Sequence, residues 1–155
     1  MGAIHVAIFD GTDALVAEGQ SIVRIPLIGP QAYLPIERLS LNYGVITDLL
    51  QTSQVLYALT DSHILILDKA GRSVLWVVDG GGERLNRWER FLVVETREAG
   101  IRLYEISPSG ELVLQSQIPI SSQLRGSAFL NQNLLAMLDQ FAGLRLLNIE
   151  DPTHP

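Results

Sequence analysis

The chain is built on a repeat of about forty residues that runs through its whole length. Four short apolar segments that begin with leucine follow one another at spacings of 41, 36 and 43 residues, and a second apolar segment follows each of them. The first set covers residues 15–17, 56–58, 92–94 and 135–137, and the second covers residues 22–25, 64–67, 103–106 and 146–149. Repetition at this period, with several strands in each unit, is typical of a β-propeller.

The repeat therefore predicts an all-β fold, a β-propeller of about four blades of antiparallel strands. Turn residues divide the chain into repeat units at about residues 4–40, 44–79, 83–120 and 124–155. We expect fifteen strands, at 6–9, 15–17, 22–27, 33–39, 45–50, 56–59, 64–67, 73–78, 85–88, 91–94, 101–106, 112–118, 127–130, 134–138 and 144–149. The last unit has residues for only three of these strands, so the last blade is predicted to be incomplete.

An incomplete blade leaves three ways to complete the fold. The 155 residues could be a segment of a larger propeller in a longer chain, two copies could close into one ring, or a ring of four blades could close alone as a single domain. An open arc would leave two apolar blade faces and its edge strands in water, which soluble proteins seldom do.

The composition is that of a folded and acidic protein. Hydrophobic residues make up 47% of the chain and charged residues 18%, which is enough apolar material for a core. The formal net charge of −6 argues against general binding to nucleic acid or to anionic lipid, because both partners are themselves negatively charged. The absence of cysteine excludes disulfides, thiolate metal ligands and cysteine nucleophiles.

The sequence predicts neither a signal peptide nor a membrane span. The first five residues carry no Lys or Arg, and an acidic residue follows at position 10, so the pattern of a signal peptide is missing. No apolar run approaches the roughly 18 residues that a membrane-spanning helix needs. The compartment of the protein therefore stays open on these grounds.

The end of the chain resembles a known repeat. Residues 143–155 read Gly-Leu-Arg-Leu-Leu-Asn-Ile-Glu-Asp-Pro-Thr-His-Pro, which is similar to the LVIVD-type propeller repeat, Gly-Leu-Arg-Val-Val-Asp-Val-Ser-Asp-Pro-x-x-Pro. Residues 99–108 keep the Gly-x-Arg start and lose the Asp-Pro close, and the first two units keep only the apolar pattern. We expect Gly100 and Gly143 to make tight hairpins, and Arg102 and Arg145 to pair with acidic loop residues. The resemblance implies a propeller, often secreted or at the cell surface, with binding roles and no catalytic residues.

One cluster of basic and aromatic residues is a candidate contact surface for a partner. It consists of Arg84, Arg87, Trp88 and Arg97. Trp and Arg dominate the residues that contribute most to binding at protein interfaces, so the cluster predicts a contact with a protein or a carbohydrate. The competing interpretation is a solvated strand face, because the interleaved acids Glu83, Glu89, Glu95 and Glu98 nearly neutralise it and exposed ion pairs contribute little.

Candidate metal and catalytic residues are few. The run Asp10-Gly11-Thr12-Asp13 lacks the further acidic ligands of a calcium loop and is predicted to be a turn. The three histidines fall in different units without metal-ligand spacing, and no nucleophile elbow is present. As an alternative function, a calcium-dependent hydrolase or lactonase of the propeller type would use oxygen ligands from successive blades, for which the candidates are Asp48, Asn86, Asn131 and Asp139.

These observations predict a binding scaffold without catalysis or a cofactor. The partner would be a protein or an extended ligand, bound by loops at one end of the strands. The candidate loops are residues 80–83, 97–100 and 140–143, of which the first is rich in glycine and is expected to be flexible. A third possibility is a purely structural segment of a larger surface or secreted protein, with the function elsewhere.

Overall fold

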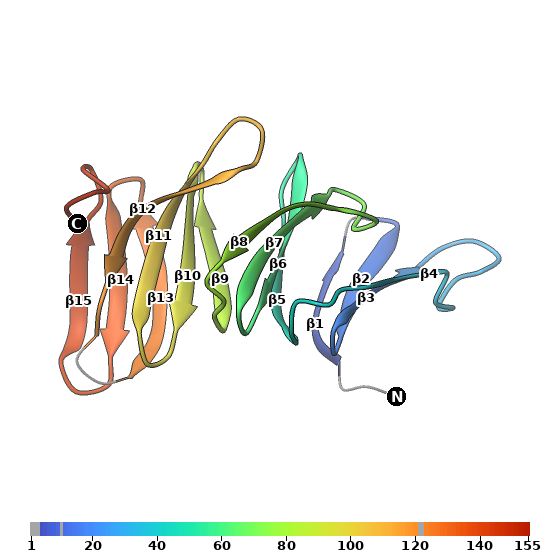
Figure 1. The fold of residues 1–155 in the computed structure, drawn as a ribbon, viewed down its shortest axis with the longest axis horizontal. Helices are drawn as coiled ribbons and strands as arrows, with labels where there is room; N and C mark the ends of the chain where they lie inside the picture. The colour runs from blue at the N-terminus through green and yellow to red at the C-terminus, as the bar shows by residue number, and fades with distance from the viewer. Residues whose placement is uncertain (1–3, 10, 121–122) are drawn as a thin grey trace. The chain divides into compact units, whose positions relative to one another are not determined.

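A computed structural model describes residues 4–9, 11–120 and 123–155, and residues 4 and 5 by their backbone alone. All regular structure in these ranges is β-strand, as the sequence predicts (Figure 1). The strands are β1 (Ile4–Phe9), β2 (Asp13–Glu18), β3 (Ser21–Pro26), β4 (Glu37–Ser40), β5 (Ile46–Gln51), β6 (Val55–Thr60), β7 (His63–Asp68), β8 (Val74–Asp79), β9 (Arg84–Trp88), β10 (Phe91–Thr96), β11 (Gly100–Ile106), β12 (Leu112–Ile118), β13 (Leu124–Asn131), β14 (Leu134–Asp139) and β15 (Gly143–Asn148).

The strands form four antiparallel sheets, each made of strands that are consecutive in the chain. Three sheets have four strands (β1–β4, β5–β8 and β9–β12), and the last has three, β13–β15. The fold is therefore all-β with propeller-like blades, and the prediction that the last sheet has three strands is confirmed. The chain divides into two compact units, residues 1–81 and 82–155, and each holds two of the sheets.

Each unit has its own apolar core between its two sheets. In the first unit, Leu15 and Ile22 of one sheet share a cluster with Leu56 and Leu65 of the other. Strand β7 of this unit is apolar on both faces, and all four residues from 64 to 67 are fully buried, as expected for a strand covered on both sides. In the second unit, Val93 and Leu103 pack in one cluster with Met137 and other residues of the last sheet.

The three-stranded sheet buries one face and exposes the other. Leu135, Met137 and Leu147 point into the core of the second unit. Leu138 lies opposite Leu144 in the register of β14 and β15, so both are on the outer face. Leu138, Leu144 and Leu146 are 47%, 66% and 56% exposed. Strand β15 pairs only with β14 among the described strands, so one of its edges is open.

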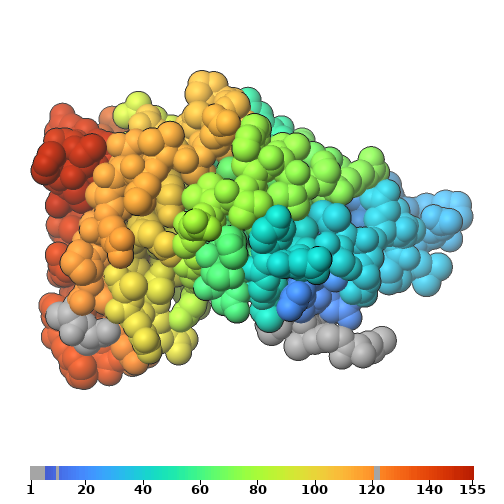
Figure 2. Space-filling view, viewed as in Figure 1, coloured from blue at the N-terminus to red at the C-terminus, as the bar shows by residue number. Residues whose placement is uncertain are grey.

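The fourth strand is the largest difference from the sequence prediction. Strand β4 begins at Glu37 and not at residue 33, because residues 27–36 fold into a turn of their own. Tyr33 has a positive φ of 67°, and its N–H donates to the Pro26 carbonyl at 2.7 Å. The loop between β3 and β4 is apolar and exposed, and it stands out from the first unit in both views (Figures 1 and 2).

The glycines of two predicted hairpins adopt the conformation that these turns require. Gly100 and Gly143 have φ values of 91° and 77°, which side chains resist and glycine tolerates. The prediction for Arg145 is wrong in its partner, because Arg145 donates to the carbonyl of Pro119 at 3.1 Å and not to an acidic side chain. Among the described residues, no helix is long and apolar enough to cross a membrane.

Candidate binding site

The loops that the sequence singles out meet at one edge of the second unit. Arg84 lies opposite Glu95 in the pairing of β9 and β10, so residues 82–83 and 97–100 are at the same end of these strands. Leu124 lies opposite Asp139 in the pairing of β13 and β14, which brings residues 140–143 to the corresponding end of the last sheet. The N–H of Leu124 donates to the carbonyl of Arg97 at 2.8 Å, and this bond joins the two ends.

Two glycines of the loop at residues 80–83 pack closely, each against the backbone of its own unit. A Cβ on Gly81 would lie 2.1 Å from the backbone nitrogen of Ser62, within the first unit. A Cβ on Gly82 would lie 2.6 Å from the Glu95 carbonyl oxygen, within the second unit. These glycines are needed because backbone approaches them closely.

A cavity of about 190 Å³ opens at the edge of the second unit. We call it the arginine pocket, and it is lined by Glu83, Arg84, Glu95, Arg97, Leu124 and Arg125. Strand β9, the turn after β10 and strand β13 supply its three guanidinium groups. The lining carries three cations and two carboxylates, so the pocket is a positive site in a chain of net charge −6.

Two of the three arginines are held in place by a neighbour. Arg97 forms an ion pair with Glu83, with Nη2 and Oε2 3.3 Å apart. The Nη2 of Arg125 donates to Oε1 of Gln140 at 2.7 Å. Arg84 is exposed, and no hydrogen bond or ion pair joins its side chain to the described part of the chain. A guanidinium has five N–H donors in a fixed plane, so all three groups retain donors for a ligand.

Glu95 is the buried acid of the pocket. It is only 7% exposed, and its Oε1 accepts two hydrogen bonds from Ser127, from the backbone N–H at 2.7 Å and from the hydroxyl at 2.6 Å. Ser127 takes part in a third bond, because the side chain of Asn86 donates to the Ser127 carbonyl at 3.0 Å. These bonds connect the two sheets of the unit. The second carboxylate oxygen, Oε2, receives no hydrogen bond from the described residues.

The structure separates the four predicted contact residues. Arg84 and Arg97 line the arginine pocket. Side chains alternate along a strand, so Arg87 lies on the opposite face of β9 from Arg84. Trp88 is at the far end of the strand, opposite Phe91, and is 39% exposed. Arg125 was missed, since it is 28 residues from Arg97 in the sequence and only the pairing of the strands brings it near.

Each of the four calcium-ligand candidates forms hydrogen bonds with nearby groups of the protein. Asp139 accepts from the N–H groups of Phe141 and Ala142. Asp48 accepts from the N–H of Leu49, and Asn131 accepts from Asn133. Asn86 donates to the Ser127 carbonyl, as described above. The described residues contain no cluster of three or more His, Asp or Glu side chains that could hold a metal ion.

The turn predicted at residues 10–13 is only partly visible. Asp10 lies outside the described residues. Asp13 is the first residue of β2, and its carboxylate pairs with Arg24 at 3.0 Å. Its role is therefore in the sheet, where it balances a largely buried guanidinium.

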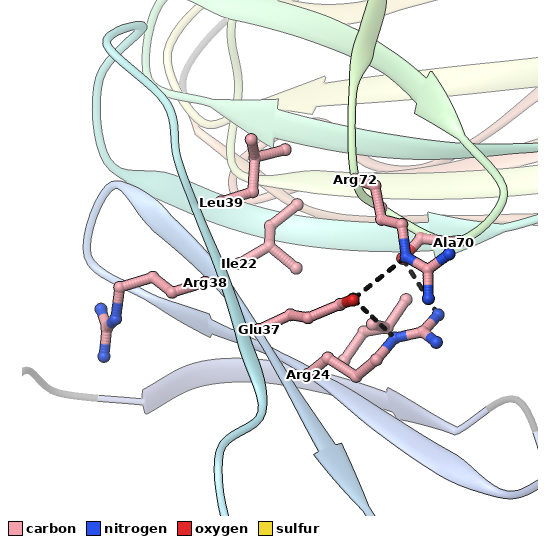
Figure 3. A pocket seen from close by; sticks show the side chains of 9 residues that line it. Ile22, Arg24, Glu37, Arg38, Leu39, Ala70 and Arg72 are labelled. Atoms are coloured by element: carbon pink, nitrogen blue, oxygen red, sulfur yellow. Dashed lines mark hydrogen bonds and ion pairs between the residues drawn. The ribbon is translucent and has the colours of Figure 1, made fainter.

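A second cavity, of about 290 Å³, lies within the first unit (Figure 3). Arg24 of β3 has a side chain only 13% exposed and donates to the carbonyl of Ala70, in the turn between β7 and β8, at 3.1 Å. Figure 3 shows Glu37 between Arg24 and Arg72, at 3.7 Å and 3.1 Å from their Nε atoms. Because these polar groups bind one another, they form a clamp between the two sheets of this unit.

Comparison with known proteins finds a likeness in structure only. No protein-family model matches the chain, and no curated protein matches it. The computationally designed Ika4 protein is 12% identical, with a TM-score of 0.73, over 96% of this chain and 92% of that one. The computationally designed Ika8 protein (13% identity, TM-score 0.71) and a chain of the Mitotic Checkpoint Complex (13%, 0.71) are matched over 97% and 96% of this chain.

The chain spans about half the length of the last two structures, since the matches cover 47% and 49% of them. At such low identity the likeness concerns the fold alone. The chain thus shares its all-β arrangement of propeller-like blades with these solved structures.

Proposed function

We propose that this chain is a non-catalytic binding scaffold of the β-propeller type, and that it binds its partner at the edge carrying the arginine pocket. The observation that carries the proposal is the convergence of Arg84, Arg97 and Arg125 on one cavity from three separate segments. Arginine is well suited to this role because its planar donor array recognises carboxylates with defined geometry. Loops presented by a rigid sheet scaffold are common sites of binding.

The propeller is the architecture that best explains the four similar sheets. Each sheet is antiparallel and built from consecutive strands, and the likeness to longer solved structures fits a larger assembly of such blades. In our proposal, the open three-stranded sheet is completed by self-association or by continuation of the propeller in a longer chain. Kinship with LVIVD-type repeats, and a location at the cell surface or outside the cell, belong to the same proposal.

The partner we propose is a protein or another extended ligand. The net charge of −6 disfavours nucleic acid, because a phosphate backbone would be repelled by the rest of the surface. Within the acidic chain, the arginine pocket offers a local positive charge to an anionic group of the partner.

A peptide-display selection tests the proposal. Peptides enriched on the wild-type protein are compared with those enriched on an Arg84→Gln/Arg97→Gln double variant and on Arg87→Gln. Arg87 is a matched control, because it lies on the same strand as Arg84 and points to the other face. We expect the double variant to lose the enriched peptides and Arg87→Gln to keep them. Retention of the same peptides by all three proteins would contradict the proposal.

A further inference from the structure

We infer that the arginine pocket recognises a carboxylate that has an N–H donor next to it, as at the C-terminus of a polypeptide or in a free α-amino acid. This inference rests on the proposed function and specifies the chemistry of its ligand. It follows from two groups that face the same cavity, the arginines at its rim and the buried acid Glu95.

The arginines account for the carboxylate. Arg84 has no partner among the described residues, so its guanidinium is available for a bidentate pair with a carboxylate. Arg97 and Arg125 are each oriented by a single neighbour, Glu83 and Gln140.

Glu95 accounts for the N–H donor. Its Oε1 already accepts two bonds from Ser127, while Oε2 receives none from the described residues. Glu95 as a residue is 7% exposed, but its Oε2 is not among the fully buried atoms that lack a partner, so this oxygen can accept a hydrogen bond from a ligand in the pocket. In a C-terminal residue the amide N–H lies one carbon away from the carboxylate, so one residue could reach both the arginines and Glu95.

The two acidic residues of the pocket also argue against phosphate as the ligand. A phosphate group offers acceptor oxygens and, near neutral pH, close to two negative charges. Glu95 and Glu83 would both repel this charge, and a phosphate dianion brings at most one O–H donor to offset the repulsion. The size of the cavity, about 190 Å³, is below the roughly 300 Å³ of typical small-molecule sites and fits one terminal residue.

Calorimetric titration of the full chain with defined probes tests the inference. The probes are acetyl-trialanine with a free carboxylate, the same peptide with a C-terminal amide, free alanine, and inorganic phosphate. We expect the free-acid peptide to bind at least about tenfold more tightly than the amide, which lacks the charge for the arginine pairs. Free alanine binding as tightly as the peptide would assign the site to free amino acids. Equal binding of acid and amide, tighter binding of phosphate, or no binding of any probe would overturn the inference.

A second comparison isolates the role of Glu95. A peptide whose last residue is N-methylalanine keeps the carboxylate and lacks the N–H. Wild type should bind it about tenfold more weakly than the parent peptide, and Glu95→Gln should show little difference between the two peptides. If wild type binds both equally, the N–H donor plays no part and the inference is wrong.

The variants distinguish this inference from the proposed function. Arg84→Gln should abolish the preference for the free acid, while Arg87→Gln should leave it intact. If selected peptides depend on Arg84 and Arg97 but bind equally well with a blocked C-terminus, the binding edge stands and the carboxylate inference falls. If no selected peptide depends on these arginines, the proposed function itself is wrong.

Discussion

Gly81 lies where the backbone leaves no room for a side chain. A Cβ at this position would be 2.1 Å from the nitrogen of Ser62 and 2.2 Å from the carbonyl carbon of Asp61. Neither neighbour is the movable end of a side chain, so the backbone itself would have to shift. The glycine is therefore required by packing and not by its φ angle.

We expect Gly81→Ala to lower the free energy of unfolding by about 3 kcal/mol, in the upper range for overpacked sites. Gly143→Ala is the matched control, because Gly143 has a positive φ of 77° and nothing within 4 Å of the added Cβ. Strain in the left-handed region should cost this variant only about 1 kcal/mol. Urea unfolding of the two variants measures both values, and a smaller loss for Gly81→Ala than for Gly143→Ala would refute the packing argument.

Tyr104 makes stability depend on pH in the alkaline range. Burial raises the pKa of its hydroxyl above the usual value of 10.0, and the positive charge of Arg102 opposes this rise. The unfolded chain therefore loses this proton at a lower pH than the folded chain does. The contribution to stability is complete below about pH 10 and is lost as the pH rises through the folded pKa.

The expected result is a steeper fall of the free energy of unfolding above about pH 10 in wild type than in Tyr104→Phe. Urea unfolding on either side of that pH measures the difference between the two proteins. Parallel pH profiles for wild type and Tyr104→Phe would show that the folded and unfolded states ionise this residue alike.

The candidate site was only partly predictable at this scale. Arg84 and Arg97 stand out in the sequence because basic and aromatic residues gather around them. Arg125 stands alone in its segment, and Glu95 looked like one of several neutralising acids. Arg125 and Glu95 join the site through the pairing of β13 with β14 and the packing of two sheets. Local sequence encodes neither of these features.

At the scale of elements, Arg24 links strands that belong to different sheets. It pairs with Asp13 across β2 and β3 and also donates to Ala70, in the turn of the neighbouring sheet. Both charged side chains are largely buried, at 13% and 17% exposure. Removal of one partner from a buried ion pair is strongly destabilising because the other charge loses its compensation.

Arg24→Met should therefore lower the free energy of unfolding by about 3 kcal/mol. Arg72→Gln is the control, since the side chain of Arg72 is 57% exposed and also binds Glu37. Its loss should cost less than about 1 kcal/mol. Thermal and urea unfolding distinguish the two variants, and similar losses would mean that the clamp contributes no more than a surface ion pair.

The strands themselves were largely predictable from the sequence. Apolar segments between turn residues give all fifteen, because a buried strand needs a continuous apolar run and a turn needs glycine or short polar residues. The start of β4 was not predictable, because residues 33–36 are mostly apolar and their pattern is typical of a strand. The loop that holds Tyr33 at positive φ depends on hydrogen bonds to Pro26 and Gly29 that pattern alone does not show.

At the scale of the whole molecule, we expect the last sheet to decide whether copies of the chain associate in solution. Its outer face carries Leu138, Leu144 and Leu146, and the edge of β15 is open among the described strands. An apolar face beside an unpaired edge favours association. The repeat in the sequence anticipated this feature, because its fourth unit matches only three of the four strands of the other units.

We expect light scattering to give a mass near twice the 17.1 kDa of one chain. A Leu144→Lys/Leu146→Lys double variant should shift the protein toward the monomer, because charged residues on an exposed sheet face oppose pairing. Circular dichroism controls for folding of the variant. A wild-type protein that stays monomeric at high concentration would show that this face does not mediate self-association.

The open edge of β15 also gives protein engineers a point of attachment. Peptides that add a strand to a sheet gain main-chain hydrogen bonds along their length, with alternate side chains available for packing. A short synthetic strand with alternating apolar and polar residues, supplied in solution or fused behind a flexible spacer, would extend this sheet to four strands like the others. Such a strand could carry a fluorophore or a second binding module. The open edge that favours association would then serve as an attachment site.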